Sequence, residues 1–283
     1  MSRVRSDNML KLRIITAILL LPLVVLVDFA VDTRWFALVF GLVIILGAWE
    51  WSRIAGLVSA NSRSAYVGLI VLLMLVVFEY RTEGWSTLLI TLAVIWWLVA
   101  TLLVVLIQKQ LFRLRESRLL FALSGLLVLI PSWFSLVLLH NEGSDTGRRL
   151  VMLLFVMIWV ADIAAYFGGR RWGKTALADL ISPKKTREGA LAGVAASMLV
   201  AVGFCLINKM QVVDIMIFSG ICLITILVSI VGDLFESLMK RRAQLKDSGS
   251  ILPGHGGVLD RIDSLTAAGP VFLAGLWASG LLI

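Results

Sequence analysis

The chain alternates between long apolar stretches and short polar segments along almost its whole length. A helix needs about 20 mostly apolar residues to cross a bilayer, and several stretches approach or exceed that length. The predicted spans are residues 12–31, 35–49, 65–79, 85–107, 119–139, 150–168, 190–208, 212–232 and 265–283. The pattern predicts an all-α, polytopic integral membrane protein with about nine transmembrane helices, of which the second and third are short.

The composition supports this interpretation. Sixty per cent of the 283 residues are hydrophobic and 16% are charged, whereas a soluble domain is about 45–50% apolar and about 25% charged. These proportions exclude a soluble globular enzyme and a disordered chain. Two cysteines exclude a disulfide scaffold.

The basic residues indicate an orientation, because Lys and Arg concentrate in cytoplasmic loops. With a cytoplasmic N-terminus and nine spans, all but five of the 26 Lys and Arg residues lie on the cytoplasmic side. The five exceptions are Arg34, Arg81, Arg148, Arg149 and Lys209. The net charge of +8 therefore indicates membrane lipid, and not nucleic acid, as the partner. We expect the first span to be retained and not cleaved as a signal peptide.

Polar residues divide the chain into two regions. Residues 1–150 look like an N-terminal transmembrane scaffold of about five spans, and Glu50, between two tryptophans, is interpreted as interfacial. Residues 151–283 look like a C-terminal catalytic transmembrane region with long cytoplasmic loops at 169–189 and 233–264.

The first polar cluster begins with Asp162, which lies inside an apolar span. An intramembrane carboxylate is costly and is a functional candidate by default. Tyr166 lies four residues on, on the same helix face, and residues 168–174 form a glycine-rich, basic turn that could hold phosphate. A helix–helix hydrogen bond and an ordinary basic loop are the alternatives.

The second cluster runs from Ser182 to Gly189. Ser182 followed by Pro183 predicts a helix start, with the serine as N-cap. Lys184 and Lys185 beside a helix N-terminus would bind phosphate; charge anchoring at the membrane surface is the alternative.

The third cluster is the richest in polar residues. Asp233, Glu236, Ser237 and Lys240 follow helical spacing and form one polar stripe. Asp260 and Asp263 are three apart at the start of the last span, after a loop rich in glycine. Carboxylates bind Mg²⁺, and Lys and Arg hold phosphate oxygens, so the sequence predicts metal-assisted phosphate chemistry.

Residues 237–263 resemble the phosphatidate cytidylyltransferase (CDP-diacylglycerol synthase) family. The resemblance rests on Ser237, Met239-Lys240-Arg241, Lys246-Asp247, Gly249, Leu252-Pro253, His255-Gly256-Gly257-Val258 and Asp260-Arg261-Ile262-Asp263. It implies transfer of CMP from CTP to phosphatidic acid, which gives CDP-diacylglycerol and pyrophosphate. It also implies an integral membrane homodimer that needs Mg²⁺, is helped by K⁺ and has a cytoplasm-facing site.

The resemblance and the spacing together assign roles. The residues expected to be catalytic are Asp233, Asp260, Asp263 and Lys240, and those expected to bind metal are Asp233, Asp260, Asp263 and Glu236. The residues expected to bind substrate are Ser182, Lys184, Lys185, Arg241, Lys246, His255 and Asp162.

Other functions stay open at this point. A CTP-dependent lipid kinase would use the same nucleotide but transfer the γ-phosphoryl group, and a non-enzymatic anion transporter could be lined by Asp162 and the basic loops. Because no transit peptide is evident, we expect a bacterial inner membrane.

Overall fold

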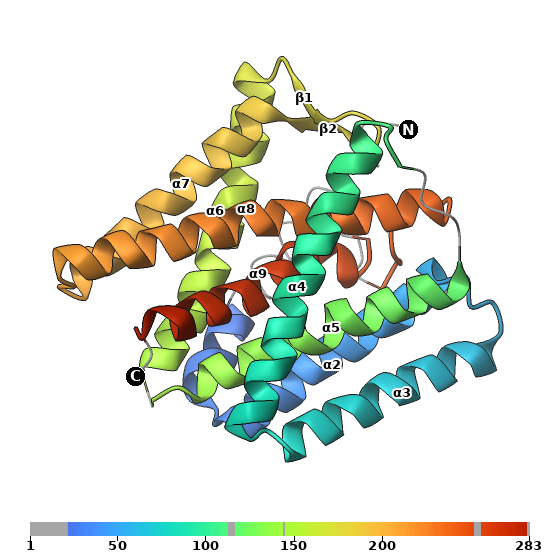
Figure 1. Cartoon of the computed structure of the whole chain (residues 1–283), viewed down its shortest axis with the longest axis horizontal. Coiled ribbons are helices and arrows are strands. Elements are labelled where there is room, and N and C mark those ends of the chain that lie inside the picture. The colour runs from blue at the N-terminus through green and yellow to red at the C-terminus, as the bar shows by residue number, and fades with distance from the viewer. Residues whose placement is uncertain (1–21, 113–116, 144, 252–255, 282–283) are drawn as a thin grey trace.

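A computed structural model describes residues 22–112, 117–143, 145–251 and 256–281, and it confirms the all-α prediction (Figure 1). The helices are α2 (Thr33–Ile54), α3 (Ala60–Glu79), α4 (Glu83–Gln108), α5 (Arg118–Asn141), α6 (Thr146–Trp172), α7 (Arg187–Ile207), α8 (Val212–Arg242) and α9 (Leu259–Ser279). A short antiparallel hairpin, β1 (Ala176–Ala178) and β2 (Ser182–Thr186), joins α6 to α7.

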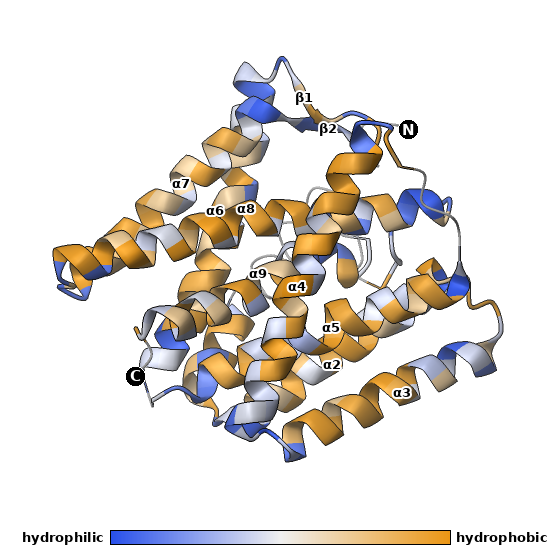
Figure 2. Cartoon of the chain, viewed as in Figure 1, coloured by the Kyte–Doolittle hydropathy of each residue, from blue (hydrophilic) through white to orange (hydrophobic). Residues whose placement is uncertain are grey.

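Seven helices within the described ranges, α2 to α8, are long and apolar enough to cross a membrane. The short second and third predicted spans become full-length helices, α2 and α3, of 22 and 20 residues. Most of the first predicted span lies outside the described residues, although 22–30 are helical. Figure 2 shows apolar colouring along the helices, with hydrophilic positions at their ends and at the hairpin.

Side-chain caps explain where several helices begin. Asp32 accepts hydrogen bonds from the backbone N–H groups of Arg34 and Trp35 at 3.0 and 3.1 Å and so caps α2. Ser59 and Ser117 cap α3 and α5 in the same manner. Short polar side chains at this position satisfy amides that have no partner inside the helix.

Helix α9 occupies the centre of the bundle. It packs on α8 and α5 and also contacts α2, α4 and α6, and in Figure 1 it lies behind α4 while α3 runs along the outer edge. Ala267, Ala268, Phe272 and Leu273 on α9 are fully buried. This central helix carries two predicted site residues at its first turns, so its packing determines where they lie.

Glycines allow the helices near these residues to approach closely. A Cβ added to Gly232 of α8 would lie 2.8 Å from both the Ala267 side chain and the Asp263 carbonyl oxygen of α9. A Cβ added to Gly193 of α7 would lie 2.8 Å from the Ala161 carbonyl oxygen of α6. Small residues at such crossings are typical of packed membrane helices.

We therefore expect Gly232→Ala to destabilise the protein. The added methyl group has to push α8 and α9 apart, and overpacking of this kind costs about 1–3 kcal/mol. Thermal unfolding of the purified protein in detergent would measure the effect as a lowered Tm.

Gly220→Ala, on the same helix, is the matched control, because a Cβ there meets nothing within 4 Å. It should change stability by no more than about 1 kcal/mol, in the stabilising direction. Equal Tm values for the two variants would contradict the close approach of α8 and α9.

Candidate active site

A cleft of about 520 Å³ opens between α6, β2, α7 and α8, with one residue each from β1 and α9. Its polar lining comes from four elements and includes two carboxylates and two lysines. These polar residues include Asp162, Ser182, Lys184, Lys185, Ser229, Asp233 and Ser264. Its apolar lining includes Ala161, Ala165, Leu177 and Ile230. The cleft thus combines charged groups with an apolar wall.

The charged centre of the cleft is an ion pair between Lys185 of β2 and Asp233 of α8. Ser237, one turn further along α8, donates a weak hydrogen bond of 3.5 Å to Asp233. Asp162 interacts electrostatically with Asp233, Lys185 and Arg261. The structure therefore brings together three predicted site residues from separate parts of the chain, Asp162, Lys185 and Asp233.

A second cluster is buried beside the cleft. The Lys240 ammonium group lies 2.9 Å from a Glu236 oxygen and 2.5 Å from an Asp260 oxygen. Asp260 also accepts hydrogen bonds from the backbone N–H groups of Ser248 and Gly257, at 3.2 and 2.9 Å. Lys240 thereby ties the end of α8 to the start of α9.

Burial alone would raise the pKa of Asp260. The hydrogen bond and charge of Lys240, with the N–H groups of Gly257 and Ser248, outweigh burial and lower that pKa below its usual value. Asp260 is therefore ionised at neutral pH, where hydrogen bonds to the charged form stabilise it.

Asp263 connects the two clusters. It interacts electrostatically with Asp233 and Lys185 of the cleft and with Glu236 of the buried cluster. One of its oxygens accepts a hydrogen bond of 2.8 Å from the backbone N–H of Ser264, which lines the cleft. The predicted carboxylates of α8 and α9 are thus neighbours.

Two of the predicted substrate-binding residues lie away from the cleft. Arg241 and Lys246 are exposed and do not line the cleft. His255 lies outside the described residues. Their roles stay predictions.

The predicted helix start at Ser182 is wrong. Ser182–Thr186 forms strand β2, which pairs with β1 through Ala178↔Ser182 and Ala176↔Thr186. Helix α7 begins only at Arg187, because Thr186 caps it by accepting a hydrogen bond of 3.1 Å from the Gly189 N–H. The lysines consequently reach the cleft from a strand edge and not from a helix N-terminus.

The interpretation of Glu50 as an interfacial residue is also wrong. Its side chain is buried, with 2% of its surface exposed. It accepts hydrogen bonds from Val258 N–H, Leu259 N–H and the Ser248 hydroxyl. The signal in the sequence was a carboxylate inside an aromatic, apolar context, but its partners lie about 200 residues away.

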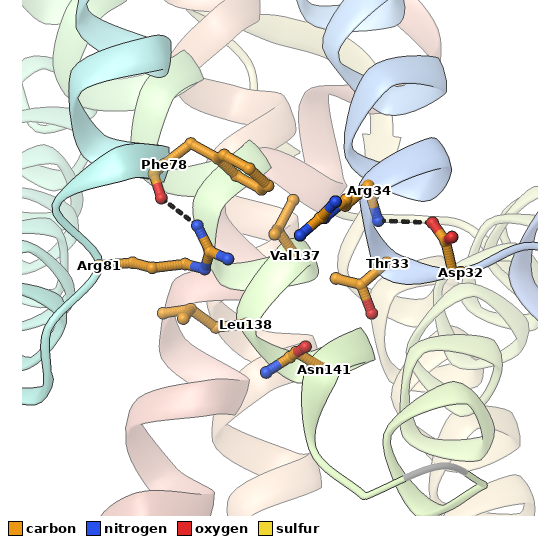
Figure 3. Close-up of a pocket in the computed structure, with 8 residues that line it drawn as sticks. All are labelled: Asp32, Thr33, Arg34, Phe78, Arg81, Val137, Leu138 and Asn141. Atoms are coloured by element: carbon orange, nitrogen blue, oxygen red, sulfur yellow. Dashed lines mark hydrogen bonds between the residues drawn. The ribbon is translucent and has the colours of Figure 1, made fainter.

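A further cavity, of about 380 Å³, lies where α2 begins and α3 and α5 end (Figure 3). Arg34 and Arg81 extend into it beside Phe78 and Val137. Its carboxylate, Asp32, is occupied as the N-cap of α2. Because the α6–α8 cleft sets carboxylates against lysines, it is the better candidate for phosphate chemistry.

The carboxylates of α8 and α9 would form only part of a metal site. Among the described residues, no three His, Cys, Asp or Glu side chains converge closely enough to hold a metal ion by themselves. Mg²⁺ in nucleotide enzymes, however, is usually bound through one or two carboxylates, and substrate phosphates and water supply the other ligands. Asp233 and its neighbour Asp263 fit that incomplete type of site.

Comparison with known proteins agrees with this chemistry. Residues 11–278 match the cytidylyltransferase family. The phosphatidate cytidylyltransferase of Pseudomonas aeruginosa is 43% identical, and the match covers 96% of this chain and 98% of that relative. The phosphatidate cytidylyltransferase of Haemophilus influenzae is 37% identical, over 93% and 97% of the two chains.

The buried cluster generates a prediction about stability. Lys240→Met keeps much of the side-chain volume but leaves Glu236 and Asp260 without their cation. Removing one member of a buried ion pair costs about 3–5 kcal/mol, so we expect a large fall in Tm.

Arg241→Met is the matched control, because Arg241 is the next residue on the same helix and is exposed. Exposed substitutions usually change stability by no more than about 0.5 kcal/mol. Similar Tm values for the two variants would show that Lys240 does not stabilise the junction of α8 and α9.

Proposed function

Because this chain belongs to the cytidylyltransferase family, we propose that it transfers the cytidylyl group of CTP to phosphatidate. An oxygen of the phosphatidate phosphate attacks the α-phosphorus of CTP. The bond from that phosphorus to the bridging oxygen of the β-phosphate breaks, pyrophosphate leaves, and CDP-diacylglycerol forms. The protein binds and orients the phosphate groups of both substrates, and no protein nucleophile takes part.

The observation that carries this proposal is the composition of the cleft. The Lys185–Asp233 ion pair belongs to the charged lining of a cleft whose apolar lining includes Ala161 and Ile230. A lipid phosphate needs cationic and hydroxyl partners for its head and apolar surface for its glycerol and acyl parts. A nucleotide triphosphate needs the same cations, so both substrates can meet here.

The residues of the cleft have distinct roles in this reaction. Lys185 and Lys184 bind non-bridging phosphate oxygens, and Ser182 donates a hydroxyl hydrogen bond beside them. Asp162 interacts electrostatically with Lys185, which keeps the ammonium group in the cleft. Fixed cations of this kind stabilise the charge that develops on the leaving pyrophosphate, and the paired orientation of two substrates lowers the entropic barrier.

We propose that Asp233 and Asp263 hold Mg²⁺ together with the phosphates of CTP. The ion would neutralise charge on the phosphate oxygens and favour attack at phosphorus. Asp260 and Glu236 contribute by fixing Lys240, which keeps α9 and therefore Asp263 beside the cleft. A direct metal role for Asp260 and Glu236, a catalytic role for Lys240, and K⁺ as a further ion, stay predictions.

The apolar helices make this an integral membrane protein. We propose that it resides in a bacterial inner membrane with the cleft facing the cytoplasm, on the side where basic residues concentrate. CTP is water-soluble and phosphatidate is held in the bilayer, so a cleft near cytoplasmic helix ends is accessible to both. The homodimer implied by the resemblance stays a prediction.

A labelling experiment tests the reaction. Detergent-purified protein receives phosphatidate micelles, Mg²⁺ and CTP labelled at the α-phosphorus. We expect label to enter the lipid fraction, and we expect no transfer when Mg²⁺ is chelated. CTP labelled at the γ-phosphorus should leave the lipid unlabelled; lipid labelling from that substrate would instead indicate a kinase.

A substitution tests the cleft. Asp233→Asn should lower kcat roughly 10²–10³-fold, as loss of a charge-stabilising group does, while the protein stays folded and membrane-inserted. Asp214→Asn, in the first turn of the same helix, is the control and should keep normal turnover. Wild-type-like kcat in the Asp233 variant would remove this carboxylate from the reaction.

A further inference from the structure

Glu50 is a buried carboxylate whose partners all belong to the opposite end of the sequence. It lies in the last turns of α2, within the region predicted to be scaffold, and only 2% of its surface is exposed. A buried carboxylate is costly unless its oxygens are hydrogen-bonded. The hydrogen-bond partners of Glu50 therefore indicate which part of the structure this carboxylate stabilises.

Its oxygens cap the central helix α9. One oxygen accepts a hydrogen bond from Val258 N–H at 3.1 Å, and the other accepts one from Leu259 N–H at 2.8 Å. These amides begin α9, and its N-cap residue, Val258, makes no side-chain cap of its own. A carboxylate at a helix N-terminus also interacts favourably with the helix dipole, so α2 supplies the cap that α9 lacks.

The same carboxylate holds the loop before α9. Its second oxygen accepts a hydrogen bond of 2.9 Å from the Ser248 hydroxyl. Glycines make room for it: a Cβ on Gly249 would lie 2.1 Å from a Glu50 oxygen, and one on Gly257 would lie 2.5 Å from the other oxygen. The described ends of this loop, at Ser248, Gly249 and Gly257, thus fit closely around Glu50.

Asp260 depends on that same loop. Its carboxylate accepts hydrogen bonds from Ser248 N–H and Gly257 N–H. Ser248 also binds Glu50 through its hydroxyl group, and Gly257 directly precedes Val258, whose N–H binds Glu50. Ser248 faces both carboxylates, with its hydroxyl on Glu50 and its amide on Asp260. A shift of the loop away from Glu50 therefore moves the donors of Asp260.

We propose that Glu50 is a positioning residue for the cytidylyl transfer proposed above, on which this inference rests. It acts at a distance: it does not line the cleft, but it holds the loop and the α9 terminus that orient Asp260 and, three residues on, Asp263. The assignment gives the N-terminal region an indirect part in the reaction geometry, through the start of α9.

The central experiment compares Glu50→Gln, Ser248→Ala and the double variant in the labelled CTP assay. Glutamine presents an NH₂ group where two N–H donors and a hydroxyl converge, so at least one hydrogen bond is lost. The loss of a buried hydrogen bond of this kind corresponds to a decrease in rate of about 10- to 100-fold. We expect kcat of Glu50→Gln to fall about that far, with the KM for phosphatidate unchanged within about two-fold, because the cleft lysines are untouched.

The double-variant cycle separates positioning from general instability. Ser248→Ala removes only the hydroxyl that binds Glu50, since its amide still donates to Asp260. If the hydroxyl acts through Glu50, adding Ser248→Ala to Glu50→Gln should lower kcat no further. Two losses that multiply, accompanied by lowered Tm values, would indicate unrelated damage to the fold and would overturn the proposal.

Ser250→Ala is the matched control, because Ser250 is exposed in the same loop; it should keep wild-type kcat. Hydrogen exchange adds a local measurement: Glu50→Gln should speed exchange at the amides of Ser248, Val258 and Leu259 and leave the middle of α8 unchanged. If Glu50→Gln does not fold, Ser248→Ala decides alone, and a kcat equal to that of Ser250→Ala would refute the inference.

The outcomes also distinguish a failure of this inference from a failure of the proposed cytidylyl transfer. A wild-type protein that transfers no label from CTP to phosphatidate overturns the proposed function. An active wild type whose Glu50→Gln variant turns over within about two-fold of it overturns only the positioning role.

Discussion

The arrangement of α8 and α9 beside the cleft depends on one buried cation, the ammonium group of Lys240. Lys240 lies between Glu236, one turn earlier on α8, and Asp260, at the start of α9. A buried charge is tolerated only with close, hydrogen-bonded partners, so neither helix can slide without separating opposite charges. The close approach at Gly232 requires the same alignment. Together they place Asp263 beside Asp233 and bring the last helix to the wall of the cleft.

The ion pairs made by Lys185 and Lys240 suit different tasks because their exposure differs. The side chains of Lys185 and Asp233 are 29% and 25% exposed, whereas those of Lys240 and Asp260 are 10% and 12% exposed. The more exposed pair can exchange its partner for a substrate phosphate at modest cost, since solvent screens both ions. Opening the buried pair would strand charges in a low-dielectric interior. In the proposed reaction, we therefore assign substrate binding to the cleft and the alignment of α8 and α9 to the buried cluster.

Local patterns predicted the helices and several of the polar residues that line the candidate cleft. The long apolar stretches indicated the spans. Helical spacing indicated one polar stripe on α8, formed by Asp233, Glu236, Ser237 and Lys240. Along that stripe, Ser237 contacts Asp233 and Lys240 contacts Glu236. Ser182-Pro183 misled because serine before proline is as compatible with an edge strand as with a helix start, and pairing with Ala178 decided it. Such pairing is a tertiary contact that propensity does not contain.

Glu50 shows why the contacts that support the candidate site were not all evident from the sequence. Its local context, an acidic residue between Trp49 and Trp51 at a helix end, is the context of an interfacial residue. What distinguishes it is a loop some 200 residues later that leaves room at Gly249 and Gly257 and points two amides at one carboxylate. Because α9 has no side-chain cap of its own, the helix that carries Asp260 and Asp263 begins correctly only against α2. The predicted boundary at residue 150 thus divides the chain by composition, while the hydrogen bonds of Glu50 make the two regions one structural unit.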